Sequence, residues 1–540
     1  MFAFSMASGL PSGSRTVWSR LSLQPLAAGP LTPFSYSVLE EVLRRAWYQY
    51  FDELGFEPMP RARVVRQQNG YPYLNLTISA QRDAEHGAIE PLTLLLNGDR
   101  FPITTWEKPG LFAALKVGRN RKKVEALLTR YETDLPRILQ KAEAWSTKTK
   151  ELRWTQADVL QVMEEIERIS VDSLKLFFAA RHHLELTCNR LLWLTEDRAP
   201  YPANVALIGN SLCDLTGLHE YTIAADLIAL GTLASADPAV MAWLAAGNYE
   251  DWPARLPNQE FVEATQKFMA NYGHRGVSEA EIRNRRWQDD PRILFTAIHT
   301  VVEKQAHTPA RLPTAQPLQQ LLGAVEGAAQ KPAQQLVAQL RRLLLLQSNA
   351  LNAFAHVLGG THRWALAAAG EAMADGRLTQ RDDVFFFALE EMKQMMTGEW
   401  NISSTHEIQA TNQKRRAEFT QWQAARVPPL LIGDAAAESV TIGLPGVSGQ
   451  ATGPLRRWMS PVPERCNGAI VGAQQFTSGW SLILPFTRSL IAADGTPLDP
   501  FVAAARAWHV PTVVGLGDVF DELVEGAQTT VQGDRGLVEQ

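Results

Sequence analysis

Two adjacent prolines, Pro428 and Pro429, separate two stretches of this chain that have different hydrophobic periods. Before them, apolar residues recur at steps of three and four, most clearly between Val159 and Phe178. That spacing is typical of a helix with one core-facing side. After them come short β-branched runs such as Thr512-Val513-Val514, which are typical of strands. The chain is therefore expected to place a large helical part before a small part that mixes strands with helices.

This change of period predicts a multidomain α+β protein with a defined order of parts. A chain of 540 residues is long enough for several domains with full cores. Residues 1–14 lack any period and are expected to be disordered. A mostly α-helical domain is predicted over residues 15–423 and a linker over 424–439, where the prolines meet an alanine tract. A small α/β domain is predicted over residues 440–540.

Composition and charge exclude several classes of binding partner. The net charge is −5 with no dominant basic run, so we expect no nucleic-acid partner. Cys188, Cys213 and Cys466 lie far apart and fit neither a disulfide framework nor a zinc pattern, so we expect no metal site and a reducing, cytoplasmic location. No run approaches the roughly 18 apolar residues of a membrane span, and the first residues make a poor signal peptide. We therefore expect no membrane partner.

A turn, a short helix and a strand are predicted near the C-terminal end. Gly495 permits a tight turn. Asp499 is a strong helix N-cap, because its carboxylate can accept a hydrogen bond from the first helical turn. Pro500 suits the first helical position, where no amide hydrogen is missed. The helix is expected over Phe501–Arg506, ahead of the strand Thr512-Val513-Val514.

The middle of the chain contains a polar loop with tight turns. Gly273 and Gly276 flank one imidazole and one guanidinium, those of His274 and Arg275. Such a loop can present several polar or aromatic side chains to one ligand pocket: His274, Arg275, Glu279, Arg286 and Trp287. The alternative is that Arg275 and Glu279 form a buried ion pair that only fixes the loop. We favour that alternative for these two residues, because buried Arg–carboxylate pairs are frequent fasteners.

Three further patterns have simple structural interpretations. His182 and His183 are adjacent on a predicted helix and point about 100° apart, so at most one of them faces a cavity. The apolar run Phe385-Phe386-Phe387 is expected to be a buried, strand-like packing segment. A long helix is expected over Arg341–Leu358.

The segment from Gly495 to Gly515 resembles the swivelling phosphohistidine domain of the family that includes phosphoenolpyruvate synthase and rifampicin phosphotransferase. In that family a Gly-Gly-x-x-Ser-His turn precedes the short helix. With Arg506 and Pro511 as anchors, the phosphoryl-accepting histidine falls on Pro500, which has no nucleophilic nitrogen. The loop Tyr272-Gly273-His274-Arg275-Gly276 resembles the family's Tyr-Gly-His-Arg-Gly motif.

The resemblance implies a degenerate member of this family that binds a small organic molecule and is not itself phosphoryl-accepting. No ATP-grasp pattern precedes Trp18, so a separately encoded ATP-grasp subunit is an expected partner, and no cofactor bound by this chain is expected. One alternative is an enzyme that reuses the pocket of the helical domain for non-phosphoryl chemistry. Another is a phosphotransferase with an unrecognised carrier, for which Asp499 is a candidate catalytic residue through an acyl phosphate. The N-cap role explains Asp499 better. We expect the His274 loop to line a cleft that faces the small domain.

Overall fold

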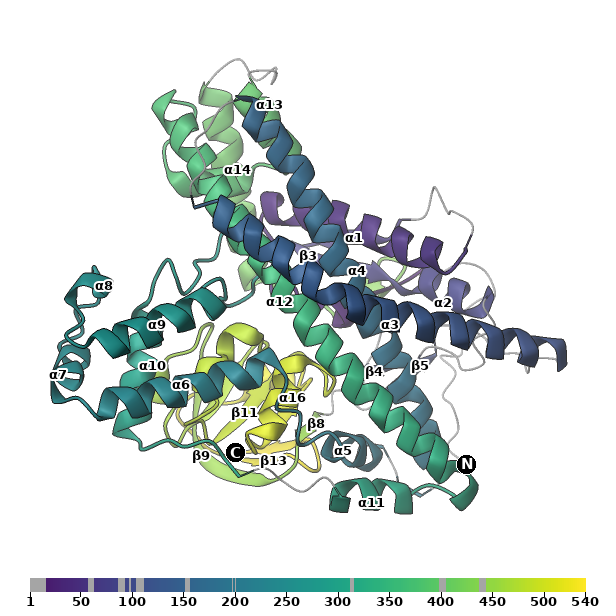
Figure 1. The fold of residues 1–540 in the computed structure, drawn as a ribbon. Coiled ribbons are helices and arrows are strands. Elements are labelled where there is room, and N and C mark those ends of the chain that lie inside the picture. Colours follow the sequence, from purple (N-terminus) through teal and green to yellow (C-terminus); the bar gives the residue numbers. More distant parts are fainter. Residues whose placement is uncertain are drawn as a thin grey trace.

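A computed structural model gives the architecture of the chain (Figure 1). The structure describes residues 16–56, 63–85, 93–96, 99–102, 111–150, 156–310 apart from 197 and 200, 315–397, 405–436 and 443–540. The segment 1–14, predicted to be disordered, lies outside the described residues. We call residues 16–424 the helical region and residues 443–540 the C-terminal α/β region.

Four long helices form the frame of the helical region. They are α1 (Pro33–Glu53), α3 (Leu111–Lys148), α4 (Gln156–Thr195) and α12 (Gln330–Ala374). Helix α12 packs against both α3 and α4, and Figure 1 shows these helices as long crossing rods. The approach of α12 to α3 is close at Gly360, where a Cβ atom would lie 2.6 Å from Nε1 of Trp145. The expected helix Arg341–Leu358 is thus the central part of a longer one.

Shorter helices surround this frame. Those before α12 are α2 (Leu76–Glu85), α5 (Ala203–Asn210), α6 (His219–Ser235), α7 (Pro238–Ala246), α8 (Trp252–Arg255), α9 (Gln259–Tyr272), α10 (Arg292–Glu303) and α11 (Ala315–Gly323). After it come α13 (Leu389–Thr397) and α14 (Thr405–Ala424). Two short 3-10 helices, η1 (Leu21–Leu23) and η2 (Gly327–Ala329), precede α12, and a third, η3 (Arg381–Phe386), follows it. The prediction of a strand-like run at Phe385–Phe387 is wrong, because these buried phenylalanines belong to η3 and its end.

An antiparallel five-stranded sheet joins the start of the chain to the end of the helical region. Its order is β2 (Val65–Gln68), β3 (Tyr71–Asn75), β1 (Val17–Ser19), β6 (Leu430–Ile432) and β7 (Ala435–Ala436). Trp18 is the register partner of Leu431 on one side and Asn75 on the other. Two of these strands lie within 424–439, so that segment is not a simple linker: it anchors its backbone in a sheet. A separate hairpin consists of β4 (Thr93–Leu96) and β5 (Asp99–Pro102).

A seven-stranded sheet forms the C-terminal α/β region, in the order β14-β13-β9-β10-β11-β12-β8. The four strands β9 (Gln450–Arg457), β10 (Ile470–Ala473), β11 (Ser489–Ala492) and β12 (Thr512–Val514) are parallel. The strands β8 (Leu444–Val447), β13 (Gln528–Gln532) and β14 (Leu537–Glu539) pair antiparallel. Short helices connect them: α15 (Pro463–Cys466), η4 (Ser478–Ile483), α16 (Pro500–Ala507) and α17 (Val519–Glu522). The predicted short helix and strand after Gly495 are confirmed.

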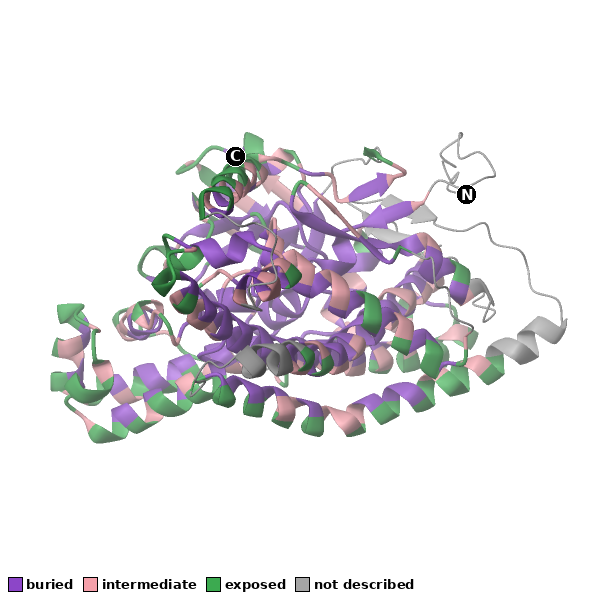
Figure 2. Cartoon of the chain, turned by 90° about the horizontal axis from the view of Figure 1, so that it is seen from above, coloured by how far each residue is buried: buried purple, intermediate pink, exposed green. Residues whose placement is uncertain are grey.

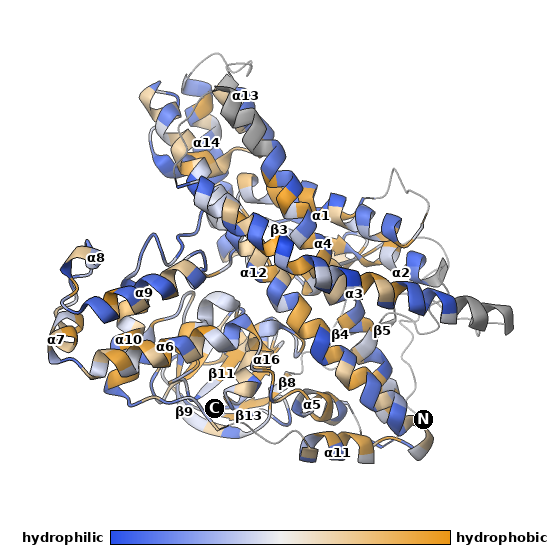
Figure 3. Ribbon diagram, in the orientation of Figure 1, coloured by the Kyte–Doolittle hydropathy of each residue, from blue (hydrophilic) through white to orange (hydrophobic). Residues whose placement is uncertain are grey.

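The two faces of this sheet belong to different apolar clusters, because side chains alternate along a strand. Ile470, Ile491 and Val513 pack in a small cluster of the C-terminal region itself. Val471 and Leu490, on neighbouring positions, belong to the large core that also includes the long helices. Figure 2 shows buried residues running through the middle of the molecule, and Figure 3 shows apolar residues on α6 and α16, which contact each other. The C-terminal region is therefore packed on the helical region through a continuous apolar interface.

No single helix among the described residues is long and apolar enough to cross a membrane; α6 and α7 meet that test only as a pair bent by 113°.

Candidate functional site between the helical and α/β regions

The turn after β11 is held against the helical region by buried polar contacts. Nη2 of Arg20 lies 2.8 Å from Oδ1 of Asp494, and both side chains are buried. The backbone N–H of Gly495 donates to Oε1 of Gln24 at 3.0 Å. Gly495 has a φ of +103°, a conformation that glycine adopts without strain. The turn that the sequence analysis singled out is thus fixed in place by residues near the start of the chain.

Asp499 occupies the N-cap position of α16, as predicted, but its carboxylate makes no capping hydrogen bond. It accepts instead from the backbone N–H and the hydroxyl of Thr496, each at 2.9 Å. Nη1 of Arg181 lies 2.8 Å from Oδ1, with 3% of each side chain exposed. The predicted capping bond is wrong, because a buried guanidinium from α4 and the preceding turn take the carboxylate oxygens. Pro500 follows at the first helical position and is buried.

The loop between α9 and α10 folds back on itself, as its glycines predicted. The backbone N–H groups of Trp287 and Gln288 donate to the carbonyls of Arg275 and Gly273, both at 2.9 Å. A Cβ atom on Gly276 would lie 2.8 Å from the carbonyl oxygen of Arg285. These contacts bring His274, Arg275, Glu279, Arg286 and Trp287 into one compact unit.

Arg275 and Glu279 form the buried ion pair that we favoured from the sequence. Nη1 of Arg275 lies 2.9 Å from Oε2 of Glu279, and Arg275 is fully buried. Nη2 of Arg286 donates to the carbonyl of Glu279 at 2.8 Å. The remaining guanidinium nitrogens, Nε and Nη2 of Arg275 and Nε and Nη1 of Arg286, have no hydrogen-bond partner among the described residues. Trp287 is buried and stacks on Phe268, with ring centroids 6.4 Å apart.

His274 is enclosed rather than turned to an open cleft. Its Nε2 atom lies 3.1 Å from Oδ1 of Asn352 on α12, and its ring stacks on His356 with centroids 3.4 Å apart. Burial lowers the pKa of His274 well below its ordinary value, and the nearby His356 and Arg275 add to the shift. The imidazole is therefore neutral at ordinary pH and is suited to hydrogen bonding rather than to charge pairing.

The loop does face the C-terminal region, across a closed contact. A Cβ atom on Gly479, in η4, would lie 2.3 Å from the carbonyl oxygen of Gly276. The backbone N–H of Ser278 donates to Oγ1 of Thr477 at 3.4 Å. Backbone touches backbone here, so in this arrangement no ligand can lie between η4 and the loop at Gly276.

A buried carboxylate beside the loop was missed by the sequence analysis. Glu220, in the first turn of α6, accepts from the hydroxyl of Ser478 at 2.6 Å and from that of Ser348 at 2.7 Å. Ser478 belongs to the C-terminal region and Ser348 to α12, so Glu220 connects the two regions. No motif or spacing in the sequence marks Glu220, because a single carboxylate gives no local sign of burial.

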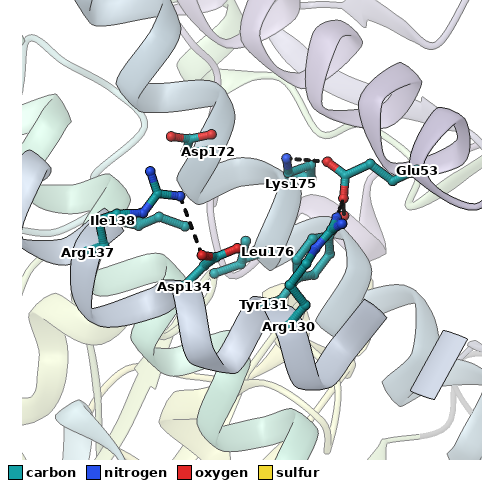
Figure 4. Close-up of a pocket in the computed structure, with 9 residues that line it drawn as sticks. All are labelled: Glu53, Arg130, Tyr131, Asp134, Arg137, Ile138, Asp172, Lys175 and Leu176. Carbon is teal, nitrogen blue, oxygen red and sulfur yellow. Dashed lines mark hydrogen bonds and ion pairs between the residues drawn. The ribbon is translucent and has the colours of Figure 1, made fainter. Parts of the chain in front are cut away.

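Two pockets lie elsewhere, between the long helices, and none of the predicted ligand-binding residues is among their lining residues. The pocket in Figure 4 has a volume of about 360 Å³ and lies between α1, α3 and α4. Most of its charged residues pair with one another. Glu53 accepts from Lys175 at 2.6 Å and also contacts Arg130, and Arg137 lies 3.5 Å from Asp134. The second pocket has a volume of about 370 Å³ and lies between α1, α3, α4 and α12, where both apolar and polar side chains line it.

Among the described residues, no group of three or more His, Cys, Asp or Glu side chains is placed to hold a metal ion. The three cysteines, Cys188, Cys213 and Cys466, are free and buried.

Two segments of the chain match family models. Residues 174–362 match a model described as the fourth domain of rifampicin phosphotransferase. Residues 466–536 match the mobile domain of PEP-utilising enzymes. The His274 loop lies in the first segment and the Asp499–Pro500 turn in the second, so the contact between the two regions is also a contact between the two matched segments.

Two relatives show weak sequence similarity to part of the chain. An uncharacterised phosphotransferase of Bacillus subtilis, YvkC, is 23% identical over 191 residues, which are 31% of this chain and 22% of that protein. A rifampicin phosphotransferase of Streptomyces sviceus is 24% identical over 192 residues, which are 33% of this chain and 21% of that protein. The chain thus matches about a fifth of the length of either relative.

Proposed function

Because this chain is related to the rifampicin phosphotransferase-like family over two segments, we propose that it is a degenerate member that binds a small organic anion and does not itself accept phosphate. A separately encoded ATP-grasp subunit is the partner that such a protein would need if phosphoryl transfer were involved.

The observation that carries this proposal is Pro500. The family resemblance puts the phosphoryl-accepting histidine at this position, and a proline nitrogen within a peptide bond cannot accept a phosphoryl group. The neighbouring carboxylate of Asp499 is already engaged by Arg181 and Thr496. An acyl phosphate at Asp499 would have to break both contacts in a buried site.

The chemical class of the ligand follows from the unpartnered guanidinium nitrogens of Arg275 and Arg286. A buried donor without a partner costs about 1–3 kcal/mol, and a carboxylate or phosphate oxygen would satisfy it. Since η4 covers the loop, we propose that the ligand enters when the C-terminal region moves away from α6 and α12.

Phosphate labelling tests the loss of the carrier function. We expect no stable label on this chain after incubation with radiolabelled ATP or phosphoenolpyruvate, alone or with the ATP-grasp domain of a rifampicin phosphotransferase. That relative's own phosphohistidine domain serves as the positive control. A label that hydroxylamine removes and that Asp499→Asn abolishes would instead establish an acyl-phosphate carrier.

A thermal-shift and calorimetric screen of carboxylates and organic phosphates tests the ligand. Arg286→Lys keeps a positive charge but loses the guanidinium fork, so a ligand found with the wild type should bind at least about tenfold more weakly. Arg292→Lys is the matched control, because Arg292 lies on the same segment and is exposed. Equal affinities in the two variants would refute the assignment of the site.

A further inference from the structure

The pocket of about 370 Å³ between α1, α3, α4 and α12 is large enough for a small molecule. Small-ligand pockets have volumes of roughly 300–1,000 Å³. On α4 it is lined by His183, Leu186, Thr187 and Arg190, which are spaced i, i+3, i+4 and i+7 and therefore share one helix face. Arg181, which holds the docked turn, precedes His183 by two residues and so points about 200° away. The pocket and the docked turn thus lie on opposite sides of α4.

Five of the lining side chains give the pocket an apolar surface. Phe51, Leu54 and Phe56 lie at the end of α1 and just after it, and Val124 on α3 and Leu186 on α4 add to them. The rings of Phe51 and Phe56 meet edge to face with centroids 5.2 Å apart. Aromatic side chains offer both large area and rigid shape, so a ligand with a flat apolar body is favoured against this surface.

A tyrosine–histidine pair supplies one defined hydrogen-bond donor. The Tyr50 hydroxyl lies 2.6 Å from Nε2 of His183, and both residues line the pocket. Burial lowers the pKa of His183 well below its ordinary value and raises that of Tyr50, so both groups are neutral. The tyrosine hydroxyl therefore donates to Nε2, and the imidazole carries its hydrogen on Nδ1. This Nδ1–H has no partner among the described residues and is not one of their buried unpartnered atoms, so a ligand in the pocket can reach it.

The charged side chains around the pocket do not favour one sign of ligand charge. Cations and acids both line it: Arg121, Lys122, Arg190, Asp83 and Glu125. Both arginines and both acids already interact with other groups, and Lys122 is exposed to solvent. Oδ2 of Asp83 has no partner, but it is buried. A charged ligand would lose hydration and compete with these existing contacts, whereas a neutral ligand has neither cost.

We propose that this pocket binds a neutral molecule with a flat, aromatic body and one hydrogen-bond acceptor, such as an aromatic ketone. The body would pack on Phe51, Phe56 and Leu186, and the acceptor oxygen would take the Nδ1–H of His183. No lining residue belongs to the His274 loop, so this site does not rest on the function proposed above.

Equilibrium dialysis of the full chain with two neutral probes tests the proposal. The first probe is 2-acetylnaphthalene, and the second is 2-isopropenylnaphthalene, in which a methylene group takes the place of the carbonyl oxygen. We expect both to bind, because they share one ring system. The alkene is the more hydrophobic, so the informative quantity is the ratio of the two affinities compared between variants. In His183→Phe, which lacks Nδ1–H, the ratio of ketone to alkene affinity should fall about three- to tenfold.

Three further variants make this comparison specific. Thr187→Val is the matched control, because Thr187 lines the same pocket but its hydroxyl donates to the carbonyl of His183 at 2.6 Å, so the affinity ratio should not change. The double variant Tyr50→Phe/His183→Phe leaves no hydroxyl without its partner and should show the same fall even where His183→Phe does not fold. Leu186→Trp fills the pocket from a half-buried position and should abolish binding of both probes while circular dichroism confirms the fold.

Each alternative outcome has a clear meaning. The same affinity ratio in the wild type and in the variants that lack His183 would overturn the role of this histidine. Unchanged binding to Leu186→Trp, or no binding of either probe to the wild type, would overturn the site. Tighter binding of 2-naphthoate than of the ketone would overturn the preference for a neutral ligand. Because Arg286 is not a lining residue, Arg286→Lys should leave the ketone affinity unchanged even if the function proposed for the interface is wrong.

Discussion

Several histidines of the interface are neutral because they are buried beside cations. Burial lowers the pKa of His356 to about 3, and the positive charge of Arg275 contributes. Burial likewise lowers the pKa of His362 to about 4, with a contribution from Arg286. A histidine that stays neutral in the folded state lowers the free energy of unfolding when the same histidine can bind a proton in the unfolded chain. This proton binding begins as the pH falls below about 6.5.

The contribution of His356 to stability is therefore complete above about pH 6.5 and declines as the pH falls towards its folded-state pKa. Between pH 7.5 and pH 5 we expect a loss of roughly 2 kcal/mol from this residue, by 1.36 kcal/mol per pH unit. His356→Asn should reduce the measured pH dependence of the unfolding free energy by that amount. His307→Gln, at an exposed site, is the control. A variant with the wild-type pH dependence would show that His356 titrates normally.

At the scale of elements, close contact between η4 and the loop after α9 depends on two facing glycines. Gly479→Ala would put a Cβ atom 2.3 Å from the carbonyl oxygen of Gly276. Because backbone cannot move aside as a flexible side chain can, we expect a loss of about 1–3 kcal/mol in the free energy of unfolding. Hydrogen exchange over residues 478–483 should also increase.

Gly370→Ala is the matched control for this prediction. Gly370 lies within α12, and a Cβ atom there would have no neighbour within 4 Å. A helix interior favours alanine over glycine by roughly 0.5–1 kcal/mol, so this variant should be more stable than the wild type. If the two alanine variants have the same stability, the contact at Gly479 is not a determinant of the interface.

At the scale of the whole molecule, Arg181 connects the docked turn to the helical region. Its guanidinium pairs with Asp499 at 2.8 Å and with Glu185 at 2.7 Å. Arg181→Met leaves two carboxylates without their cation and should cost roughly 3–5 kcal/mol. Asp499→Asn should cost less, about 1–3 kcal/mol, because Arg181 keeps Glu185. Urea unfolding and hydrogen exchange over residues 489–507 measure both effects.

A surface ion pair between the segment just after the helical region and the C-terminal region is the control. Arg426 contacts Asp518 at 2.7 Å, but the Asp518 side chain is 85% exposed. Solvent screens such a pair, so Arg426→Met should cost at most about 1 kcal/mol. Arg181→Met and Arg426→Met with equal stabilities would contradict the view that Arg181 fixes the position of the C-terminal region.

The sequence by itself determined the local elements and their order. The spacing of apolar residues predicted the helix around Val159–Phe178, and Pro500 located the start of α16, because hydrophobic period and the fixed φ of proline act within one or two turns of chain. The Arg275–Glu279 pair was predictable for the same reason, since four residues separate its members. The inference that at most one of His182 and His183 faces a cavity needed only helix geometry, and His183 is the one that lines a pocket.

Only the tertiary structure decided which distant groups meet. Arg181 and Asp499 are 318 residues apart, and the pairing of β1 with β6 joins the start of the helical region to the segment that follows it. No local period encodes such contacts. A side chain that could cap a helix can instead bond to a stronger donor, if the fold buries that donor beside it. For the same reason the sequence could propose His274 for a cleft but could not foresee that His356 and η4 enclose its loop. It likewise gave no sign that His183 and Tyr50 would share a pocket.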